Sequence, residues 1–231
     1  MRPRLVVLHY TAMAGVGAAL ARLCDPAAEV SAHWLIGADG AVHALVPEER
    51  RAWHAGAGAW GRVTDVNSAS IGIELDNPGD RPFAAAQMRA LETLLDAIMA
   101  RWNIPPQGVI GHSDMAPGRK RDPGARFDWF RLARAGRSVW PPGAGGAPDP
   151  PRGSGQAGGA APAGAAPPAA WPARFHRAAR RFGYPVDHVP AEAVLAAFRM
   201  RFRPWARGGL QAADVAMIEG LAARWPGPGM D

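Results

Sequence analysis

The sequence contains one cysteine, one lysine and no long hydrophobic run. The single thiol, Cys24, excludes both an intramolecular disulfide framework and a cysteine-rich zinc module. No stretch reaches the ~18 continuous apolar residues that a membrane span requires, so we expect no membrane span. An ordinary hydrophobic core must therefore stabilise the chain.

The N-terminus also has little that would direct export. Its apolar run, residues 5–8, has four residues, whereas a secretory signal needs an apolar core of about 7–15 residues. As written, the sequence predicts a cytoplasmic protein, and a periplasmic or envelope location would follow if the recorded start is wrong. We also expect a monomer.

The composition is that of a globular chain with one biased segment. Of the 231 residues, 48% are apolar and 20% are charged, which is close to ordinary usage. Residues 141–170 are almost entirely Ala, Pro and Gly and contain no Leu, Ile, Val or Phe, so they cannot bury a core. The composition predicts a large domain over 1–140, a flexible linker over 141–170 and a small domain over 171–231.

The charge is modestly basic. The formal net charge is +6, and residues 171–231 hold 9 basic and 5 acidic side chains. Such a balance suits nucleic acid, an anionic envelope polymer or a solvated arginine surface. The basic tail, with Arg199, Arg201 and Arg203, lacks a clustered stripe of basic and base-stacking side chains. We therefore expect no nucleic-acid partner.

The hydrophobic pattern predicts an α/β fold. Strands are expected over 4–10, 69–75 and 109–110, with a hairpin over 33–46 around an Asp-Gly turn. Helices are expected over 15–24, 82–102 and 127–135. This order favours a mixed central β-sheet flanked by helices. The tail should add a small all-α unit with helices over 173–182, 191–202 and 211–225.

Two histidines follow predicted strands, where sites are commonly built. His9 ends the first strand, His112 follows the last, and Asp122 comes ten residues later in a Pro/Gly-rich stretch that we expect to be non-helical. Two imidazoles and one carboxylate leave a fourth tetrahedral position for water, as in catalytic zinc sites. Spacing alone is weak evidence for this set.

Two further side chains invite a catalytic interpretation. In the strand over 69–75, Glu74 shares a face with Gly72, opposite the apolar residues 71, 73 and 75. Such a carboxylate can act as a general base, although an exposed strand face fits equally well and Asp76 is a competitor. Lys120 offers a compact ammonium for a developing oxyanion, or it is simply solvated.

Five motifs occur in order along residues 4–137. They are HYTA from residue 9, SAHWLI from 31, WHAG from 53, NSASIGIELDN from 67 and GHSDMAPGRKRDP from 111. Together they resemble the zinc-dependent N-acetylmuramoyl-L-alanine amidases, which share a fold with peptidoglycan-recognition proteins. The tail from residue 171 is more weakly similar to a small helical peptidoglycan-binding domain.

The resemblance implies a role for each matched residue. The zinc ligands would be His9, His112 and Asp122. Glu74 would be the general base and later proton donor, and Lys120 would stabilise the oxyanion. In a related branch a tyrosine precedes the histidine of the SAHWLI motif, where this chain has Ala32, so catalysis should depend on Glu74. The remaining matched positions, assigned to substrate binding, are His33, Trp53, His54 and Asn67.

The implied reaction is hydrolysis of the amide between N-acetylmuramic acid and the L-alanine of the stem peptide. A non-catalytic peptidoglycan-binding module is the alternative. The sequence also leaves the substrate open between polymeric peptidoglycan and anhydro-muropeptides. The missing export signal favours muropeptide recycling, whereas a tethered binding module favours a repeating polymer.

Overall fold

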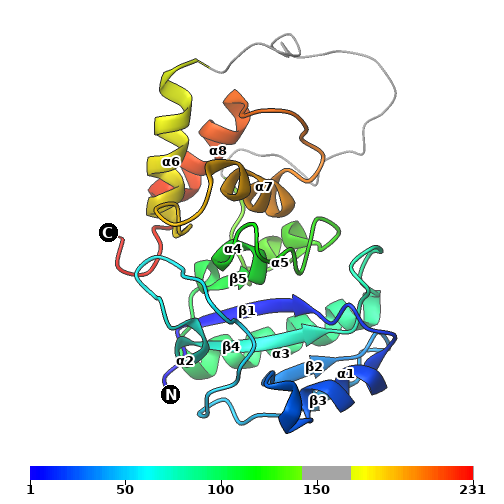
Figure 1. The fold of residues 1–231 in the computed structure, drawn as a ribbon. Coiled ribbons are helices and arrows are strands. Elements are labelled where there is room, and N and C mark those ends of the chain that lie inside the picture. Colours follow the sequence, from blue (N-terminus) through cyan, green and yellow to red (C-terminus); the bar gives the residue numbers. More distant parts are fainter. Residues whose placement is uncertain (142–167, 231) are drawn as a thin grey trace.

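The computed structural model describes residues 1–141 and 168–230. A five-stranded sheet with the order β3-β2-β4-β1-β5 forms its centre (Figure 1). Its strands are β1 (Leu5–Tyr10), β2 (Trp34–Ile36), β3 (Val42–Ala44), β4 (Ser70–Leu75) and β5 (Val109–Gly111). β3 pairs antiparallel with β2, and all other pairs are parallel. The predicted mixed sheet is thus confirmed, whereas residues 142–167 of the predicted linker lie outside the described residues.

The two central strands present alternate residues to two different cores. Val6 and Leu8 of β1, with Ile71 and Ile73 of β4, belong to one hydrophobic cluster. Leu5 and Val7 belong to the other. Because residues that pair in a parallel register share a face, Ser70, Gly72 and Glu74 lie with Leu5, Val7 and His9. The predicted alternation along this strand is confirmed.

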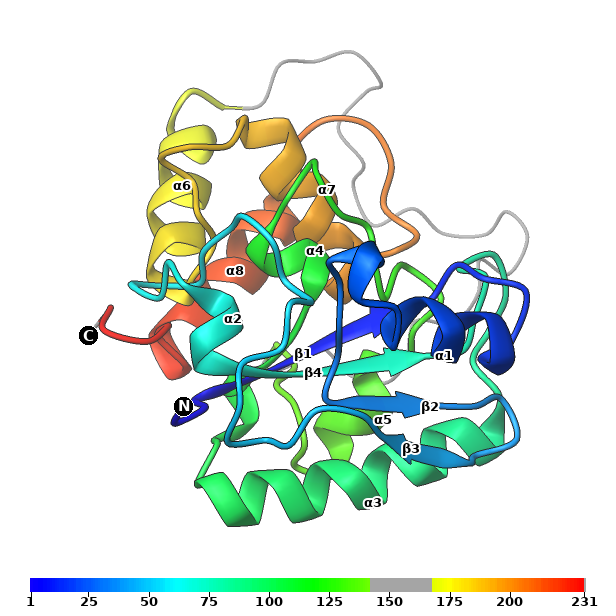
Figure 2. The ribbon, with the colours of Figure 1, turned by 60° about the horizontal axis from the view of Figure 1, so that its bottom comes forward.

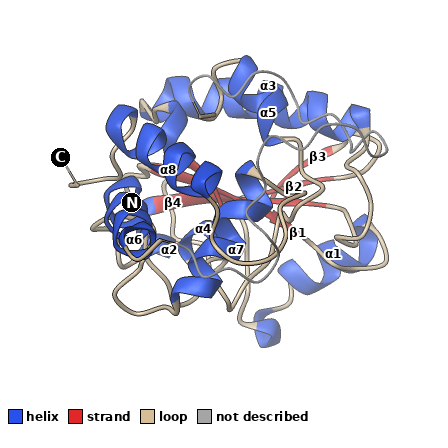
Figure 3. Cartoon of the chain, turned by 90° about the horizontal axis from the view of Figure 1, so that it is seen from above, coloured by secondary structure: helices blue, strands red, loops and turns tan. Residues whose placement is uncertain are grey.

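Helices cover both faces of the sheet. On one side lies α3 (Ala85–Trp102), as Figure 2 shows. This helix buries Met88, Leu91, Leu95 and Ile98. α5 (Trp129–Arg134) joins the same cluster. α1 (Val16–Leu23) and α2 (Val66–Ala69) lie on the other side of the strands (Figure 3). Within the described ranges, no helix has the length and apolarity needed to cross a membrane.

The sheet domain also contains two short 3₁₀ helices and a buried side-chain amide on α3. The 3₁₀ helices are η1 (Pro26–Ala28) and η2 (Pro106–Gly108), and η2 begins at the prolines predicted to stop α3. Gln87, within the apolar stripe of α3, donates to the carbonyl oxygens of Ile36 and Asp76. This amide ties the helix to the ends of β2 and β4, a polar contact that the hydrophobic pattern does not reveal.

The tail forms α6 (Ala170–Phe182), α7 (Ala191–Phe202) and α8 (Ala212–Arg224), close to the predicted ranges. Figure 1 shows these helices stacked beyond the β5 edge of the sheet. Their aromatic side chains share one hydrophobic cluster with Leu5, Val7 and Trp60. The backbone N–H of Gly61 also donates to the carbonyl of Gly183 over 2.8 Å. The described tail is therefore packed on the sheet domain.

Three of the tail arginines bind acids inside the protein. Arg199 and Arg203 both bind Asp214, and Arg201 binds Asp114. None of these guanidinium groups is on an exposed basic face, since all of them are largely buried.

Candidate metal centre

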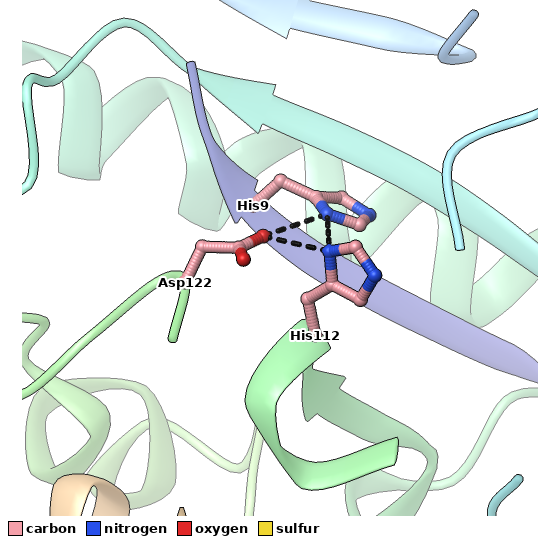
Figure 4. Close-up of side chains that lie close together, drawn as sticks. All are labelled: His9, His112 and Asp122. Atoms are coloured by element: carbon pink, nitrogen blue, oxygen red, sulfur yellow. Dashed lines mark hydrogen bonds and ion pairs between the residues drawn. The ribbon is translucent and has the colours of Figure 1, made fainter. Parts of the chain in front are cut away.

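His9, His112 and Asp122 converge at the carboxyl ends of β1 and β5 (Figure 4). The two Nδ1 atoms lie 2.9 Å apart, and each lies 2.9 Å from Oδ2 of Asp122. All three side chains are buried, with 1%, 3% and 8% of their residue surface exposed, respectively. The fold thus brings together the three residues predicted as metal ligands.

A one-turn helix, α4 (His112–Met115), stands where the sequence predicts a non-helical stretch. That prediction was wrong because the carboxylate of Asp114 accepts from the N–H of Gly111 over 2.8 Å and stabilises the first turn. The backbone N–H of Ser113 also donates to the carbonyl of Asp122 over 2.9 Å. These two bonds hold His112 and Asp122 side by side.

The protonation states suit a cation. Burial and the neighbouring His112 lower the pKa of His9 to about 4, so its ring is neutral near pH 7. Burial opposes ionisation of Asp122, but its close contacts with the imidazoles of His112 and His9 hold the pKa of that carboxyl well below its usual range. Neutral imidazole and ionised carboxylate are the forms that bind metal.

The donor set fits zinc. Nε2 of His112 lies 2.8 Å from the carbonyl oxygen of Ala55, so this nitrogen carries the proton and Nδ1 presents a lone pair. Lone pairs and a carboxylate oxygen facing one another at 2.9 Å are stabilised by a cation between them. Donors on tetrahedral zinc lie ~3.3 Å apart, a few tenths of an ångström from this arrangement.

Glu74 lies beside this centre. It pairs in register with His9 and lines the same cavity. Its Oε2 is buried and has no hydrogen-bond partner among the described residues. Burial, and then the charge of Asp122, raise the pKa of Glu74 to about 8. A carboxyl with such a pKa can take up and return a proton near neutral pH.

Lys120 also lines the cavity, whereas the competing acid does not. The backbone N–H of Lys120 donates to the carbonyl of Ala116 at the end of α4, over 3.0 Å. Asp76 lines a separate hollow with Asn77 and Arg81. The structure therefore places Glu74, and not Asp76, next to the three converging side chains.

The cavity has a volume of about 460 Å³ and opens into a longer groove. A second hollow of about 560 Å³ shares Leu23, Val30, Ser31 and Trp53 with it. Trp53 is 57% exposed, and the guanidinium of Arg51 stacks 4.5 Å from its ring. An elongated ligand would therefore meet an aromatic wall on leaving the metal centre.

Two residues predicted to bind substrate do not line this cavity. Nδ1 of His33 accepts from the N–H of Gly72 over 2.9 Å, and its Nε2 bonds to the carbonyl of Arg50 over 3.1 Å. Asn67 uses Oδ1 to accept from the N–H groups of residues 54 and 55. The structure gives both side chains backbone partners, while Trp53 and His54 do line the cavity.

Two further residues near the centre, Arg22 and Ser70, were not predicted from the sequence. Arg22 lines the cavity from α1, but nothing in its local pattern separates it from the other arginines. Ser70, completely buried in β4, bonds to His54 and to the carbonyl of Val66. A hydroxyl inside an apolar strand was the available signal for Ser70.

The comparisons with known proteins agree with this geometry. Residues 1–125 match the family model described as N-acetylmuramoyl-L-alanine amidase. The chain is 37% identical over 252 residues to the N-acetylmuramoyl-L-alanine amidase AmiD of Escherichia coli (strain K12), covering 97% of this chain and 84% of that protein. It is 41% identical over 103 residues to the 1,6-anhydro-N-acetylmuramyl-L-alanine amidase AmpD of Enterobacter cloacae, covering 45% and 55%, respectively.

Solved structures extend the similarity to the tail. AmiD from E. coli, in complex with the substrate anhydro-N-acetylmuramic acid-L-Ala-D-gamma-Glu-L-Lys, has a TM-score of 0.80 and 36% identity, covering 100% of this chain and 91% of that one. AmpDh3 from Pseudomonas aeruginosa has a TM-score of 0.76 and 29% identity, covering 97% and 93%. The shared architecture therefore includes the helical tail.

Fold and site define an α/β amidase with a His–His–Asp group at the strand ends. The chain belongs to the N-acetylmuramoyl-L-alanine amidase family. The expected activity, hydrolysis of the bond between N-acetylmuramic acid and L-alanine, is thereby confirmed for the family. The names of these relatives favour an enzyme over the alternative binding module.

Proposed function

We propose that this chain is a zinc-dependent amidase that cleaves the muramoyl–L-alanine amide of anhydro-muropeptides. His9, His112 and Asp122 would hold the metal. The observation that carries the proposal is their convergence beside the buried carboxyl of Glu74. Zinc, when bound, polarises the scissile carbonyl and lowers the pKa of its water.

The other residues would manage protons and charge. Oε2 of Glu74 takes the proton of the attacking water as the water oxygen bonds to the lactyl carbonyl carbon. The ammonium of Lys120 stabilises the negative charge that develops on the carbonyl oxygen. Glu74 then returns the proton to the alanine nitrogen as the C–N bond breaks. The products are a lactyl carboxylic acid, which loses its remaining proton at neutral pH, and a free stem peptide.

The groove supports a muropeptide substrate. Trp53 offers an exposed aromatic face, and Arg22 supplies positive charge for stem-peptide carboxylates. AmiD, similar over the whole length of this chain, was solved with an anhydro-muramyl tripeptide. Because one chain supplies every residue of the proposed site, a monomer would suffice.

We further propose the domain division expected from the sequence, with 1–140 catalytic and 171–231 peptidoglycan-binding. The tail has an apolar hollow of about 500 Å³, with His176 and Glu192 among its lining residues. The test is co-sedimentation of full-length Glu74→Gln protein with sacculi. Less pelleting after His176→Ala and Glu192→Ala supports binding through this hollow, and unchanged pelleting contradicts it.

Mass spectrometry of reaction products tests the amidase proposal. The purified protein is incubated with anhydro-muropeptides and with sacculus fragments, with chelator and after zinc is restored. Free stem peptide that disappears with chelator and returns with zinc is the expected result, with anhydro-muropeptides preferred. Asp122→Ala should lose zinc and activity, and His188→Ala, an exposed control, should keep both. No release by folded, zinc-loaded protein would overturn the proposal.

A further inference from the structure

We propose that His54, backed by Ser70, sets the tautomer of His9 so that its Nδ1 offers a lone pair to the metal. The inference rests on the proposed zinc site. His54 would then be a positioning residue, in addition to lining the cavity. A chain of three hydrogen bonds from the core to the metal centre carries the argument.

The series of hydrogen bonds begins at the hydroxyl of Ser70, whose single proton is already used in a bond to a backbone carbonyl. The Ser70 hydroxyl donates to the carbonyl oxygen of Val66 over 2.6 Å. Oγ therefore turns a lone pair toward Nε2 of His54, 3.3 Å away. Because a hydroxyl has one proton, the proton of this second bond must be on Nε2 of His54. The distal nitrogen of His54 is thus a donor.

The donor at Nε2 of His54 also determines which nitrogens of His54 and His9 carry protons. The imidazole of His54 is half-buried, and in its neutral form a proton on Nε2 leaves Nδ1 as an acceptor. Nδ1 of His54 lies 3.0 Å from Nε2 of His9, which must therefore donate. A neutral His9 with its proton on Nε2 has an unprotonated Nδ1. That atom is the one that faces His112 and Asp122.

The position of the His54 ring is built into the fold. A Cβ at Gly72 would lie 2.4 Å from Cγ and 2.6 Å from Nδ1 of His54, so the ring occupies the space that a larger residue would fill. Asn67 accepts from the backbone N–H groups of His54 and Ala55, over 3.1 and 2.8 Å. The space above Gly72 in β4 and the anchored backbone of residues 54 and 55 together fix the position of the His54 ring.

One dipeptide would therefore orient both histidine ligands. His54 accepts from Nε2 of His9 through its side chain, and Ala55 accepts from Nε2 of His112 through its carbonyl, over 2.8 Å. Hydrogen bonds to the outer nitrogen of a histidine ligand fix its tautomer and increase its basicity. The bond between His9 and His54 can be removed by a side-chain substitution, whereas the bond between His112 and Ala55 uses a backbone carbonyl.

The test compares three variants with a matched control. His54→Leu removes the acceptor, His54→Asn keeps an acceptor oxygen near the Nδ1 position, and Ser70→Ala removes the backing hydroxyl. His188→Leu makes the first change on the exposed surface. Zn²⁺ affinity is measured by competition with a chromophoric chelator, and the imidazole tautomers by two-bond ¹H–¹⁵N correlation spectra with and without zinc.

We expect His54→Leu to weaken Zn²⁺ binding about 10–100-fold. His54→Asn should stay close to wild type, and Ser70→Ala should fall between them. Wild-type spectra should show His9 protonated on Nε2, and His54→Leu should shift or lose that signal. Thermal melts establish that each variant is folded, and if His54→Leu does not fold, the other two variants decide.

Zn²⁺ affinity of folded His54→Leu within about threefold of wild type, with His9 still protonated on Nε2, would overturn the relay. If His54→Leu does not fold, a Ser70→Ala protein with wild-type Zn²⁺ affinity and an unchanged His9 tautomer would overturn the relay. Failure of the wild-type protein to bind Zn²⁺ would instead overturn the proposed function. The spectra of the metal-free protein separate the two cases.

Discussion

Arg201 in α7 donates to the carboxylate of Asp114 in α4, with Nη1 2.7 Å from Oδ2 and both side chains buried. The hydroxyl of Tyr184 donates to the other oxygen of Asp114 over 2.8 Å. Asp114 in turn accepts from Gly111, one residue before His112. The helical tail therefore helps to stabilise the turn that carries a proposed metal ligand.

Replacing Arg201 with Ala should leave Asp114 as an uncompensated buried charge. We expect a loss of about 3–5 kcal/mol in the free energy of unfolding, measured by denaturant titration. Weaker Zn²⁺ binding should accompany it because the α4 turn loosens. Arg174→Ala removes an exposed ion pair with Glu219 and should leave the unfolding midpoint nearly unchanged. Equal effects of the two substitutions would contradict this account.

Local patterns predicted the sheet, its covering helices, the strand-end position of His9 and the face of β4 on which Glu74 lies. They could not predict the pairing of Asp114 with Arg201, because 87 residues separate the partners and single-chain spacing carries no such signal. The α4 turn escaped prediction for a different reason: its Asp114–Gly111 bond is local, but it lies in a segment whose Pro and Gly content favoured a loop. The tail composition suggested a tethered unit, whereas its packing depends on aromatic contacts that form only in three dimensions.

Replacing Lys120 with Met should reduce kcat and leave the metal in place. The methionine keeps an unbranched side chain one heavy atom shorter than lysine and removes the charge proposed to stabilise the oxyanion. Loss of one such donor typically costs ~10²–10³-fold in kcat. Steady-state kinetics on an anhydro-muropeptide, together with zinc content, provide the measurement. A normal kcat with zinc bound would assign oxyanion stabilisation to another group.

Stability of the metal-free protein should depend on pH through Glu74. Burial raises its folded-state pKa from 4.5 to about 8, so the folded protein binds more protons than the unfolded chain in this interval. The stability contribution of Glu74 is fully present below pH 4.5 and is lost as the pH rises through about 8. Glu74→Gln should therefore gain stability relative to wild type between pH 5 and pH 8.

Urea unfolding at several pH values, in the presence of chelator, measures this difference. The slope attributable to one group cannot exceed about 1.4 kcal/mol per pH unit. A constant difference between wild type and Glu74→Gln across the range would show that Glu74 has an ordinary pKa. The same variant, loaded with zinc, should retain the metal and lose most of its activity.

Gly72→Ala should damage the metal centre without touching a ligand. The added Cβ would lie 2.4 Å from Cγ of His54, so either the ring or β4 must move. Overpacking of this kind costs about 1–3 kcal/mol of stability. We expect a lower unfolding midpoint and weaker Zn²⁺ binding, because His54 would lose its contact with His9.

Gly17→Ala is the matched control for Gly72→Ala. Gly17 is an exposed residue of α1, where an added Cβ would meet no atom within 4 Å. Alanine in a helix is favoured over glycine by about 0.5–1 kcal/mol, so this protein should be slightly more stable with unchanged Zn²⁺ affinity. If Gly72→Ala behaved like Gly17→Ala in both measurements, the space at Gly72 would have no part in holding His54, and the positioning role would lose its structural basis.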